Sequence, residues 1–174
     1  MKNLTIFCSS KNGLKEDYIQ ITRDLISKID ICKYTIVYGG SSIGLMGEVR
    51  NTFINNGGKI ISSNLHRFVE NDENDDYIFD YISDRQSKLI DLADILLLLP
   101  GGFGSMYECL ETITKNQICE ISKPIIIFNY NHIYDHFLKQ IIVLQEDGFI
   151  KNTLESYNVV VFTNIDDIIE YLKY

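Results

Sequence analysis

Two glycine-rich turns are the segments of this sequence best suited to hold a small ligand. They read YGGSSIGLMG, with Gly39, Gly40 and Gly44, and LPGGFGSMYE, with Gly101, Gly102 and Gly104. Glycine permits positive φ and a close approach of a ligand to the backbone. A helix that starts at such a turn adds free amides and the positive end of its dipole. Either turn alone could be an empty strand-to-helix connection, but two in one sheet favour an anion site, most often for phosphate.

Polar side chains near the second turn could act on a ligand bound there. Ser105 follows the last glycine of that turn, and Glu108 stands three residues later. The same pair matches a capping box, in which Ser105 would cap the helix and Glu108 would reach back to its start. Arg85 lies upstream in a helix-period segment and, taken alone, has the character of an ordinary solvated arginine. These residues by themselves therefore leave capping and chemistry as alternatives.

The sequence does not predict a metal or cofactor site. His132 and His136 stand four apart with Asp135 between them, but no third ligand follows at a motif spacing. The spacing G-x-G-x-x-G is absent from the first strand-to-helix turn, and G-x-x-x-x-G-K-[ST] is absent as well. These absences argue against NAD, FAD and a standard P-loop nucleotide site. We therefore expect no metal and no cofactor.

The candidate residues are set in an alternation of short β-rich runs and helix-period segments. Strands are expected at Leu4–Cys8, Tyr34–Tyr38, Lys59–Ser62, Ile95–Leu99, Pro124–Phe128 and Val159–Phe162. Helices are expected at Glu16–Ile29, Leu45–Asn56, Ser83–Ala93, a segment around Met106–Ile113, Tyr134–Glu146 and Ile165–Tyr174. This order predicts an α/β fold with a doubly wound parallel sheet, Rossmann-like, and helices on both faces. No repeat or linker divides the chain, so residues 1–174 are expected to form a single domain.

The predicted sheet brings three connections to one rim. All strand-to-helix loops of a parallel sheet lie at one edge, so Ser9, Ser10 and Lys11 after the first strand join the two glycine turns. With a strand order of 3-2-1-4-5, the first strand and Ile95–Leu99 are neighbours at the switch point. Ligands bind in the crevice that opens there.

Composition and charge exclude several classes of partner. The chain has 174 residues, a formal net charge of −8 and 45% hydrophobic residues. This balance argues against binding to nucleic acid and against docking on an anionic membrane. No apolar run approaches the length of a membrane span, and the acidic run Glu70–Asp76 has the character of a solvated loop. Cys8, Cys32, Cys109 and Cys119 form no C-x-x-C pair, so we expect small core hydrophobes in a reducing cytoplasm.

Four motifs in order resemble one family, the LOG proteins, which are cytokinin-activating phosphoribohydrolases formerly described as lysine decarboxylases. The segment PGGFGSMYE at Pro100–Glu108 is similar to the family signature PGGxGTxxE, and DRQSK places Arg85 at the family's upstream arginine. FCSSK and GGSSIGLMG are similar to FCGSS and GGGxxGLMG. The resemblance covers nearly the whole chain.

The resemblance implies a Rossmann-like, usually homodimeric hydrolase of the N-glycosidic bond of a nucleoside 5′-monophosphate. The substrate would be a cytokinin riboside monophosphate or AMP, and the products would be the free base and ribose 5-phosphate. Arg85 and Glu108 occupy the positions of the family's catalytic residues. We expect the substrate and its phosphate to be bound by Ser9, Ser10, Gly39, Gly40, Gly44, Gly101, Gly102, Gly104 and Ser105.

The chain departs from the family pattern at several positions. The usual residues are replaced by Ser9, Lys11, Ser41, Gln86, Ser105 and Tyr107. Of these, Gln86 loses the charge of the usual lysine, whereas Ser105 keeps the hydroxyl of the usual threonine. These changes bear on substrate choice and rate more than on the fold.

Two other functions are compatible with parts of the sequence. A nucleotide- or cofactor-binding carrier of the same fold would need the glycine turns but neither Arg85 nor Glu108. Decarboxylation of an amino acid with pyridoxal phosphate would need a Schiff-base lysine, and no lysine stands in a recognisable site. For the hydrolase, a nearby arginine would lower the pKa of Glu108. Glu108 would then be ionised and act as a base or an electrostatic stabiliser.

Overall fold

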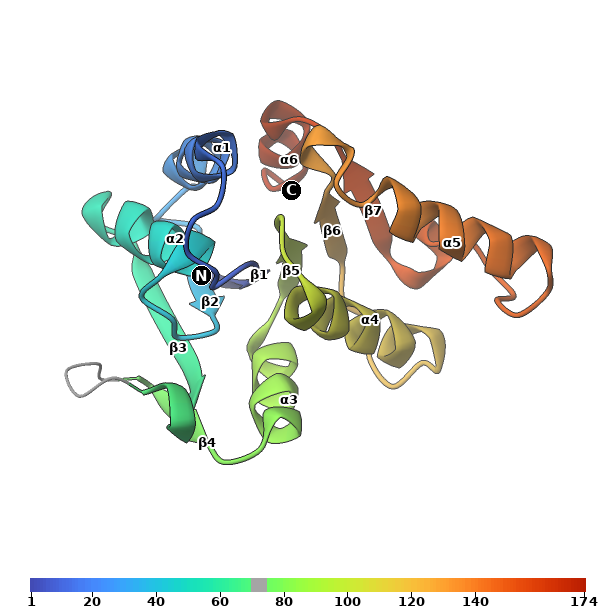
Figure 1. Cartoon of the computed structure of the whole chain (residues 1–174), viewed down its shortest axis with the longest axis horizontal. Helices are drawn as coiled ribbons and strands as arrows, with labels where there is room; N and C mark the ends of the chain where they lie inside the picture. Colours follow the sequence, from blue (N-terminus) through green and yellow to red (C-terminus); the bar gives the residue numbers. More distant parts are fainter. Residues whose placement is uncertain (70–74) are drawn as a thin grey trace.

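A single parallel sheet organises the computed structural model, which describes residues 1–69 and 75–174 (Figure 1). Its seven strands have the order β4-β3-β2-β1-β5-β6-β7. Their bounds are β1 Lys2–Phe7, β2 Tyr34–Tyr38, β3 Lys59–Leu65, β4 Tyr77–Phe79, β5 Ile95–Leu98, β6 Ile125–Phe128 and β7 Val159–Phe162. The predicted doubly wound α/β fold is confirmed.

Six α-helices cover the two faces of this sheet (Figure 1). They are α1 Glu16–Lys28, α2 Gly44–Asn55, α3 Ile82–Leu92, α4 Phe103–Gln117, α5 Asp135–Glu146 and α6 Ile165–Tyr171. Helices α1, α2 and α6 pack with alternate strand residues such as Ile6 and Leu97. Helices α3, α4 and α5 pack with the intervening residues, such as Phe7 and Leu98. The central strands are therefore apolar on both faces, as the continuous apolar run ILLLL at β5 indicates in the sequence.

The crossover point lies between β1 and β5. These strands pair in parallel from Leu4 opposite Ile95 to Phe7 opposite Leu98, while β2 pairs with the other side of β1. Beyond the strands, the amide of Ser9 donates to the carbonyl of Pro100 at 3.2 Å and so ties the two following loops together. The predicted order of the five central strands and the position of the switch point are confirmed.

Two details differ from the sequence-based expectations, and one expectation falls mostly on residues that the structure does not describe. The edge strand β4 was missed, because three residues are too few for any periodic pattern. Most of the acidic run Glu70–Asp76 lies outside the described residues. Cys8 and Cys109 are buried as expected, but Cys32 and Cys119 are exposed. Among the described residues, no helix has the length and apolar character needed to cross a membrane.

Candidate active site

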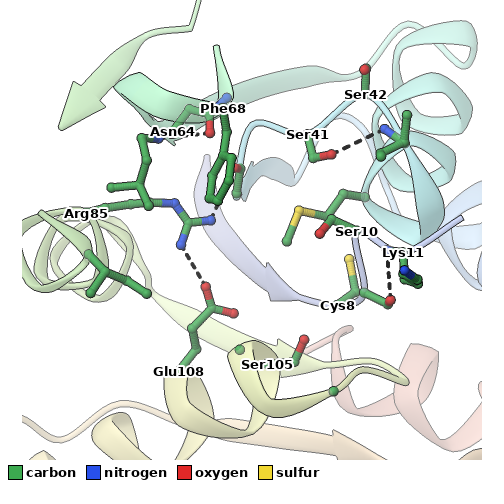
Figure 2. A pocket seen from close by; sticks show the side chains of 18 of the residues that line it. Cys8, Ser10, Lys11, Ser41, Ser42, Asn64, Phe68, Arg85, Ser105 and Glu108 are labelled. Carbon is green, nitrogen blue, oxygen red and sulfur yellow. Dashed lines mark hydrogen bonds and ion pairs between the residues drawn. The ribbon is translucent and has the colours of Figure 1, made fainter. Parts of the chain in front are cut away.

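A pocket of about 650 Å³ opens at the carboxyl edge of the sheet, beside the switch point. Its wall comes from the connections after β1, β2, β3 and β5, together with residues of α3 and α4. Figure 2 shows Arg85 and Glu108 on one side and Ser10 and Lys11 on the other. The predicted site residues that line it are Ser9, Ser10, Gly39, Arg85, Gly102, Gly104, Ser105 and Glu108.

Arg85 is buried and bonded at each of its three nitrogens. Its Nε donates to the carbonyl of Ser63 at 2.8 Å, Nη2 to the carbonyl of Gly39 at 3.1 Å, and Nη1 to Oε1 of Glu108 at 2.9 Å. Only 7% of the residue is exposed. The interpretation of Arg85 as a solvated arginine is therefore wrong. The cause is the packing of α3 against β3, which carries the guanidinium under the ends of two strands.

The conformation of Arg85 explains the glycine at position 39. A Cβ on Gly39 would lie 2.2 Å from Nη2 of Arg85, far inside van der Waals contact. Gly39 does line the pocket, but its absent side chain leaves room for the arginine. The two residues form one unit, in which the turn after β2 accepts a hydrogen bond that helps hold the guanidinium.

Glu108 projects from α4 into the pocket and meets Arg85 there (Figure 2). Only 5% of the residue is exposed. Oε1 accepts from Arg85, whereas Oε2 accepts from no described residue. Burial raises the pKa of this carboxyl above its ordinary value, and the Arg85 guanidinium opposes that effect only in part. The predicted lowering of the pKa of Glu108 is therefore wrong, because the sequence showed the arginine but not the desolvation.

The backbone beside Glu108 is held from two sides. The side chain of Gln86 donates to the carbonyl of Glu108 at 3.1 Å, and the hydroxyl of Thr112 donates to the same carbonyl at 2.9 Å. Gln86 is fully buried, and its Oε1 has no partner among the described residues. Gln86, which stands where the family pattern has a lysine, therefore supports α4 and contributes no charge to the pocket.

The capping-box interpretation of Ser105 and Glu108 is wrong. Helix α4 begins at Phe103, its N-cap is Gly102, and no side chain caps it. Ser105 thus lies inside the first turn. It is 4% exposed, lines the pocket and makes no hydrogen bond to a described residue. A Cβ on Gly101 would lie 2.2 Å from its hydroxyl oxygen, so glycine is needed at position 101 for Ser105 to take this position.

The two helix N-termini differ in how many amides are free. At α2, the amide of Gly44 donates to Oδ1 of Asn12 and the amide of Met46 to the carbonyl of Ser9. At α4, the amides of Phe103, Gly104 and Ser105 have no partner among the described residues. Free amides at a helix start favour an anion. The second glycine turn is therefore the better anion site.

The remaining predicted glycines shape the turns from outside the pocket lining. Gly40 and Gly44 have φ values of +83° and +62°. A Cβ on Gly40 would meet Asn64, and a Cβ on Gly44 would meet the backbone of Ser10 and Lys11. Gly40, Gly44 and Gly101 are absent from the residues that line the pocket. Their role in this structure is to permit close packing.

Sequence reasoning missed one whole side of the pocket. The end of β3 and the short 3-10 helix at His66–Phe68 contribute Asn64, Arg67 and Phe68. Phe68 is 63% exposed, and the guanidinium of Arg67 lies 5.1 Å from the centre of its ring. An aromatic residue soon after a strand was the available signal in the sequence. Cys8 also lines the pocket, but burial raises the pKa of its thiol so far that it stays protonated at neutral pH.

The histidine pair does not assemble a metal site in the described part of the chain. His132 contacts Asp135 at 3.2 Å, and both side chains are largely exposed. Across residues 1–69 and 75–174, no three histidine, cysteine or acidic side chains converge to hold a metal ion.

Comparison with known proteins identifies relatives of the chain. A family model described as "Possible lysine decarboxylase" matches residues 38–172. The chain is 30% identical over 155 residues to the cytokinin riboside 5′-monophosphate phosphoribohydrolase LOG5 of Arabidopsis thaliana, covering 86% of this chain and 68% of that protein. It is 27% identical over 178 residues to the cytokinin riboside 5′-monophosphate phosphoribohydrolase of Rhodococcoides fascians, covering 99% of this chain and 89% of that protein.

Solved structures share the fold. The molybdenum cofactor carrier protein of Chlamydomonas reinhardtii matches with a TM-score of 0.72 over 99% of this chain and 96% of that one. The sequence identity is 16%, so the likeness concerns the fold alone.

Proposed function

The chain belongs to the LOG family, whose family model is described as possible lysine decarboxylase, and on that basis we propose that it hydrolyses nucleoside 5′-monophosphates. The scissile bond is the N-glycosidic bond of a cytokinin riboside monophosphate or of AMP. The products are the free base and ribose 5-phosphate. The observation that carries this proposal is the buried ion pair of Arg85 and Glu108, 2.9 Å apart in the pocket wall. Membership of the family by itself does not establish the reaction or the substrate of this chain.

The substrate is oriented by its phosphate. The 5′-phosphate binds at the start of α4, where three amides are free and Ser105 offers an unpartnered hydroxyl. This contact lies away from the reacting carbon, so its binding energy can be used to position the ribose. The base extends toward the apolar side of the pocket, where Phe68, Ile82 and Tyr107 are exposed.

Glu108 acts as the base and as the electrostatic stabiliser of the reaction. Breaking the C1′–N bond leaves positive charge on the ribose, and a carboxylate close to C1′ stabilises that charge. Water adds to C1′ as the bonding electron pair departs with the base. Glu108 accepts a proton from the attacking water, and the departing base takes up a proton in turn. Oε2, which is free of Arg85, is the oxygen available for this step.

Arg85 holds the carboxylate in position. Its three nitrogens already donate to Glu108, Ser63 and Gly39, so its orientation is set before substrate binds. A preorganised charge costs no rearrangement during the reaction. It also keeps Glu108 ionised in a buried setting that would otherwise favour the protonated acid.

The runner-up function is a non-catalytic carrier of a nucleotide or cofactor. The molybdenum cofactor carrier proteins with a similar fold motivate this alternative. A carrier gains nothing from a buried ion pair beside the ligand, since taking two charges out of water is costly even when they attract each other. The Arg85–Glu108 pair therefore favours the hydrolase.

We further propose that the protein is a homodimer in the reducing cytoplasm. One face of α4 exposes Phe103, Tyr107 and Leu110 in a stripe at helical spacing, and Ile118 is exposed directly after the helix ends. Tyr107 also lines the pocket, so this stripe reaches the pocket mouth. A second copy of the chain would cover these side chains and close that side of the site.

The proposed function is tested with a panel of nucleoside 5′-monophosphates and the matching nucleosides. Free base is measured by chromatography. We expect AMP or an N6-substituted AMP to be cleaved and the nucleosides to react far more slowly. Tight binding of a nucleotide without release of any base would favour the carrier. Equal turnover of AMP and adenosine would contradict the phosphate anchor.

A further inference from the structure

The loop after β1 is held rigidly between the two helix N-termini. The amide of Ser9 donates to the carbonyl of Pro100, and the carbonyl of Ser9 accepts from the amide of Met46 in α2. The hydroxyl of Ser9 accepts from the amide of Lys11 at 3.0 Å. Gly44 lies so close that an added Cβ would be 2.7–2.8 Å from the backbone of Ser10 and Lys11. These contacts set the position from which the side chain of Lys11 leaves the backbone.

Lys11 brings a positive charge to the pocket wall opposite Arg85. The charged residues that line the pocket are Lys11, Arg67, Arg85 and Glu108. Arg85 is committed to Glu108 and to two carbonyls. Lys11 is exposed and forms no ion pair with any described residue. Figure 2 shows Lys11 near Ser10, across the pocket from Arg85.

Groups at the start of α4, in the same pocket as Lys11, are suited to an anion. The amides of Phe103, Gly104 and Ser105 at the start of α4 are free among the described residues. The hydroxyl of Ser105 lies in the pocket wall, in a residue that is 4% exposed and has no hydrogen-bond partner in that part of the chain. Backbone amides and one hydroxyl can bind a phosphate dianion, but they leave its charge largely uncompensated. An ammonium group that lines the same pocket supplies that charge.

We propose that Lys11 is a phosphate-binding residue of this site and sets its preference for 5′-phosphorylated ligands. The proposal rests on the proposed function, because it assigns the phosphate end of that substrate. The family pattern has serine at this position, so the cation is a feature of this chain. Lys11 contacts the phosphate and not the reacting carbon, so it determines binding more than the chemical step.

The test compares Lys11→Gln with Lys15→Gln. Lys15 is also an exposed lysine, four residues further along, but it does not line the pocket. Calorimetry measures binding of ribose 5-phosphate, and steady-state kinetics measure KM and kcat for AMP. We expect Lys11→Gln to weaken ribose 5-phosphate binding and raise the KM for AMP by about tenfold, as is typical for loss of a charge-assisted hydrogen bond. Lys15→Gln should resemble wild type, and Lys11→Arg should restore most of the affinity.

The outcomes separate this proposal from the proposed function. If wild-type protein releases no base but binds ribose 5-phosphate through Lys11, the hydrolase fails and the phosphate contact stands. If wild-type protein cleaves AMP and Lys11→Gln binds ribose 5-phosphate as tightly as Lys15→Gln, the role of Lys11 is refuted. A wild-type protein that binds no ribose 5-phosphate refutes it as well. A fall in kcat at constant KM would also overturn it, since it would place Lys11 in the chemical step.

Discussion

The ion pair of Arg85 and Glu108 is the residue-scale feature on which the site depends. Both side chains are almost completely buried, and their nearest atoms are 2.9 Å apart. Burial of two charges is costly, and the attraction between them offsets that cost only while both are present. The intact pair is therefore expected to contribute more to function than to net stability. Removal of one partner should lower the free energy of unfolding, because it leaves the other charge buried without compensation.

Replacement of Arg85 by alanine should reduce both turnover and stability. The change leaves Glu108 as a buried carboxylate without its counter-charge, and it frees the carbonyls of Ser63 and Gly39. Loss of one partner of a buried pair typically costs about 3–5 kcal/mol. We expect the loss of unfolding free energy to be larger at pH 8 than at pH 5, because protonation of Glu108 relieves the buried charge. Denaturant titration at both pH values measures this. An equal loss at both would show that Glu108 is not the affected group.

Replacement of Glu108 by glutamine should separate charge from shape. Glutamine keeps a side-chain oxygen that can accept from Arg85, but it has no charge and is a negligible base. Turnover should fall by at least about a hundredfold, within the range for loss of a general base. Nucleotide binding should persist, because the proposed phosphate contacts, from the start of α4 and from Lys11, do not involve Glu108. Exposed Glu120→Gln is the control. Near-normal hydrolysis by Glu108→Gln would remove the glutamate from the mechanism.

The raised pKa of Glu108 predicts opposite pH dependences for stability and turnover. Since the folded state binds this proton more tightly than the unfolded chain, that stabilising contribution is complete below the ordinary value of 4.5. It is lost as pH rises through the folded pKa. Turnover depends on the carboxylate and should rise over the same interval. Thermal melts and initial rates across this range measure both. Glu108→Gln should remove this pH dependence of the melting temperature. Equal pH dependence of the melting temperature in wild type and Glu108→Gln would show that the pKa of the carboxyl is not raised by folding.

At the scale of elements, the site depends on how closely α3 and α4 approach the ends of β2 and β3. Arg85 leaves α3 and reaches the carbonyl of Gly39, directly after β2, and the carbonyl of Ser63, in the last three residues of β3. Glu108 approaches from α4, whose backbone is held by Gln86 of α3. The two helices are thus joined by both a side-chain ion pair and a side-chain-to-backbone hydrogen bond. A small displacement of either element would separate the catalytic pair.

Replacement of Gly39 by alanine should act through Arg85. The added Cβ would lie 2.2 Å from Nη2, so the arginine must move away from Glu108. We expect a loss of turnover with the parallel sheet intact by circular dichroism. The decisive comparison is the double variant Gly39→Ala with Arg85→Ala, because coupled residues show non-additive effects. Little further loss from Gly39→Ala once Arg85 is absent supports the mechanism. A full additive loss would place Gly39 in direct contact with the substrate instead.

At the scale of the whole molecule, one pocket collects segments from much of the sequence. Residues from Cys8 to Glu108 line it, and they come from both sides of the switch point. The apolar stripe on α4 borders this pocket and faces away from the sheet. The oligomeric state and the completeness of the site are therefore connected in the proposed dimer.

A charge placed in the α4 stripe should dissociate the proposed dimer. Leu110 is 42% exposed, so Leu110→Glu should leave the folded chain intact while it opposes burial of the stripe against a second copy. Light scattering after size exclusion should give twice the chain mass for wild type and the single chain mass for the variant. Ile54→Glu is the matched control, since Ile54 is 41% exposed on α2, at the opposite face of the sheet. A wild-type monomer, or equal behaviour of both variants, would refute this interface.

The sequence by itself determined the order of elements and the edge of the sheet that carries the site. Runs such as ILLLL and the helical spacing of Met106, Cys109 and Ile113 are local patterns that identify strands and helices. Because crossover connections between parallel strands are right-handed, this alternation of strands and helices is compatible with only a few sheet topologies. The carboxyl-edge position of both glycine turns follows from the same topology. The resemblance to the LOG family identified Arg85 and Glu108 as the two candidate catalytic residues.

Only the tertiary structure decided the environment of each side chain. The burial of Arg85, the raised pKa of Glu108 and the close contact at Gly39 depend on segments between 22 and 46 residues apart. A periodic pattern reports which face of an element is apolar, but it contains no information on the distance to another element. The same reason explains why the residues alone left Ser105 open between a helix cap and a ligand contact, and why the side of the pocket formed by Arg67 and Phe68 was missed.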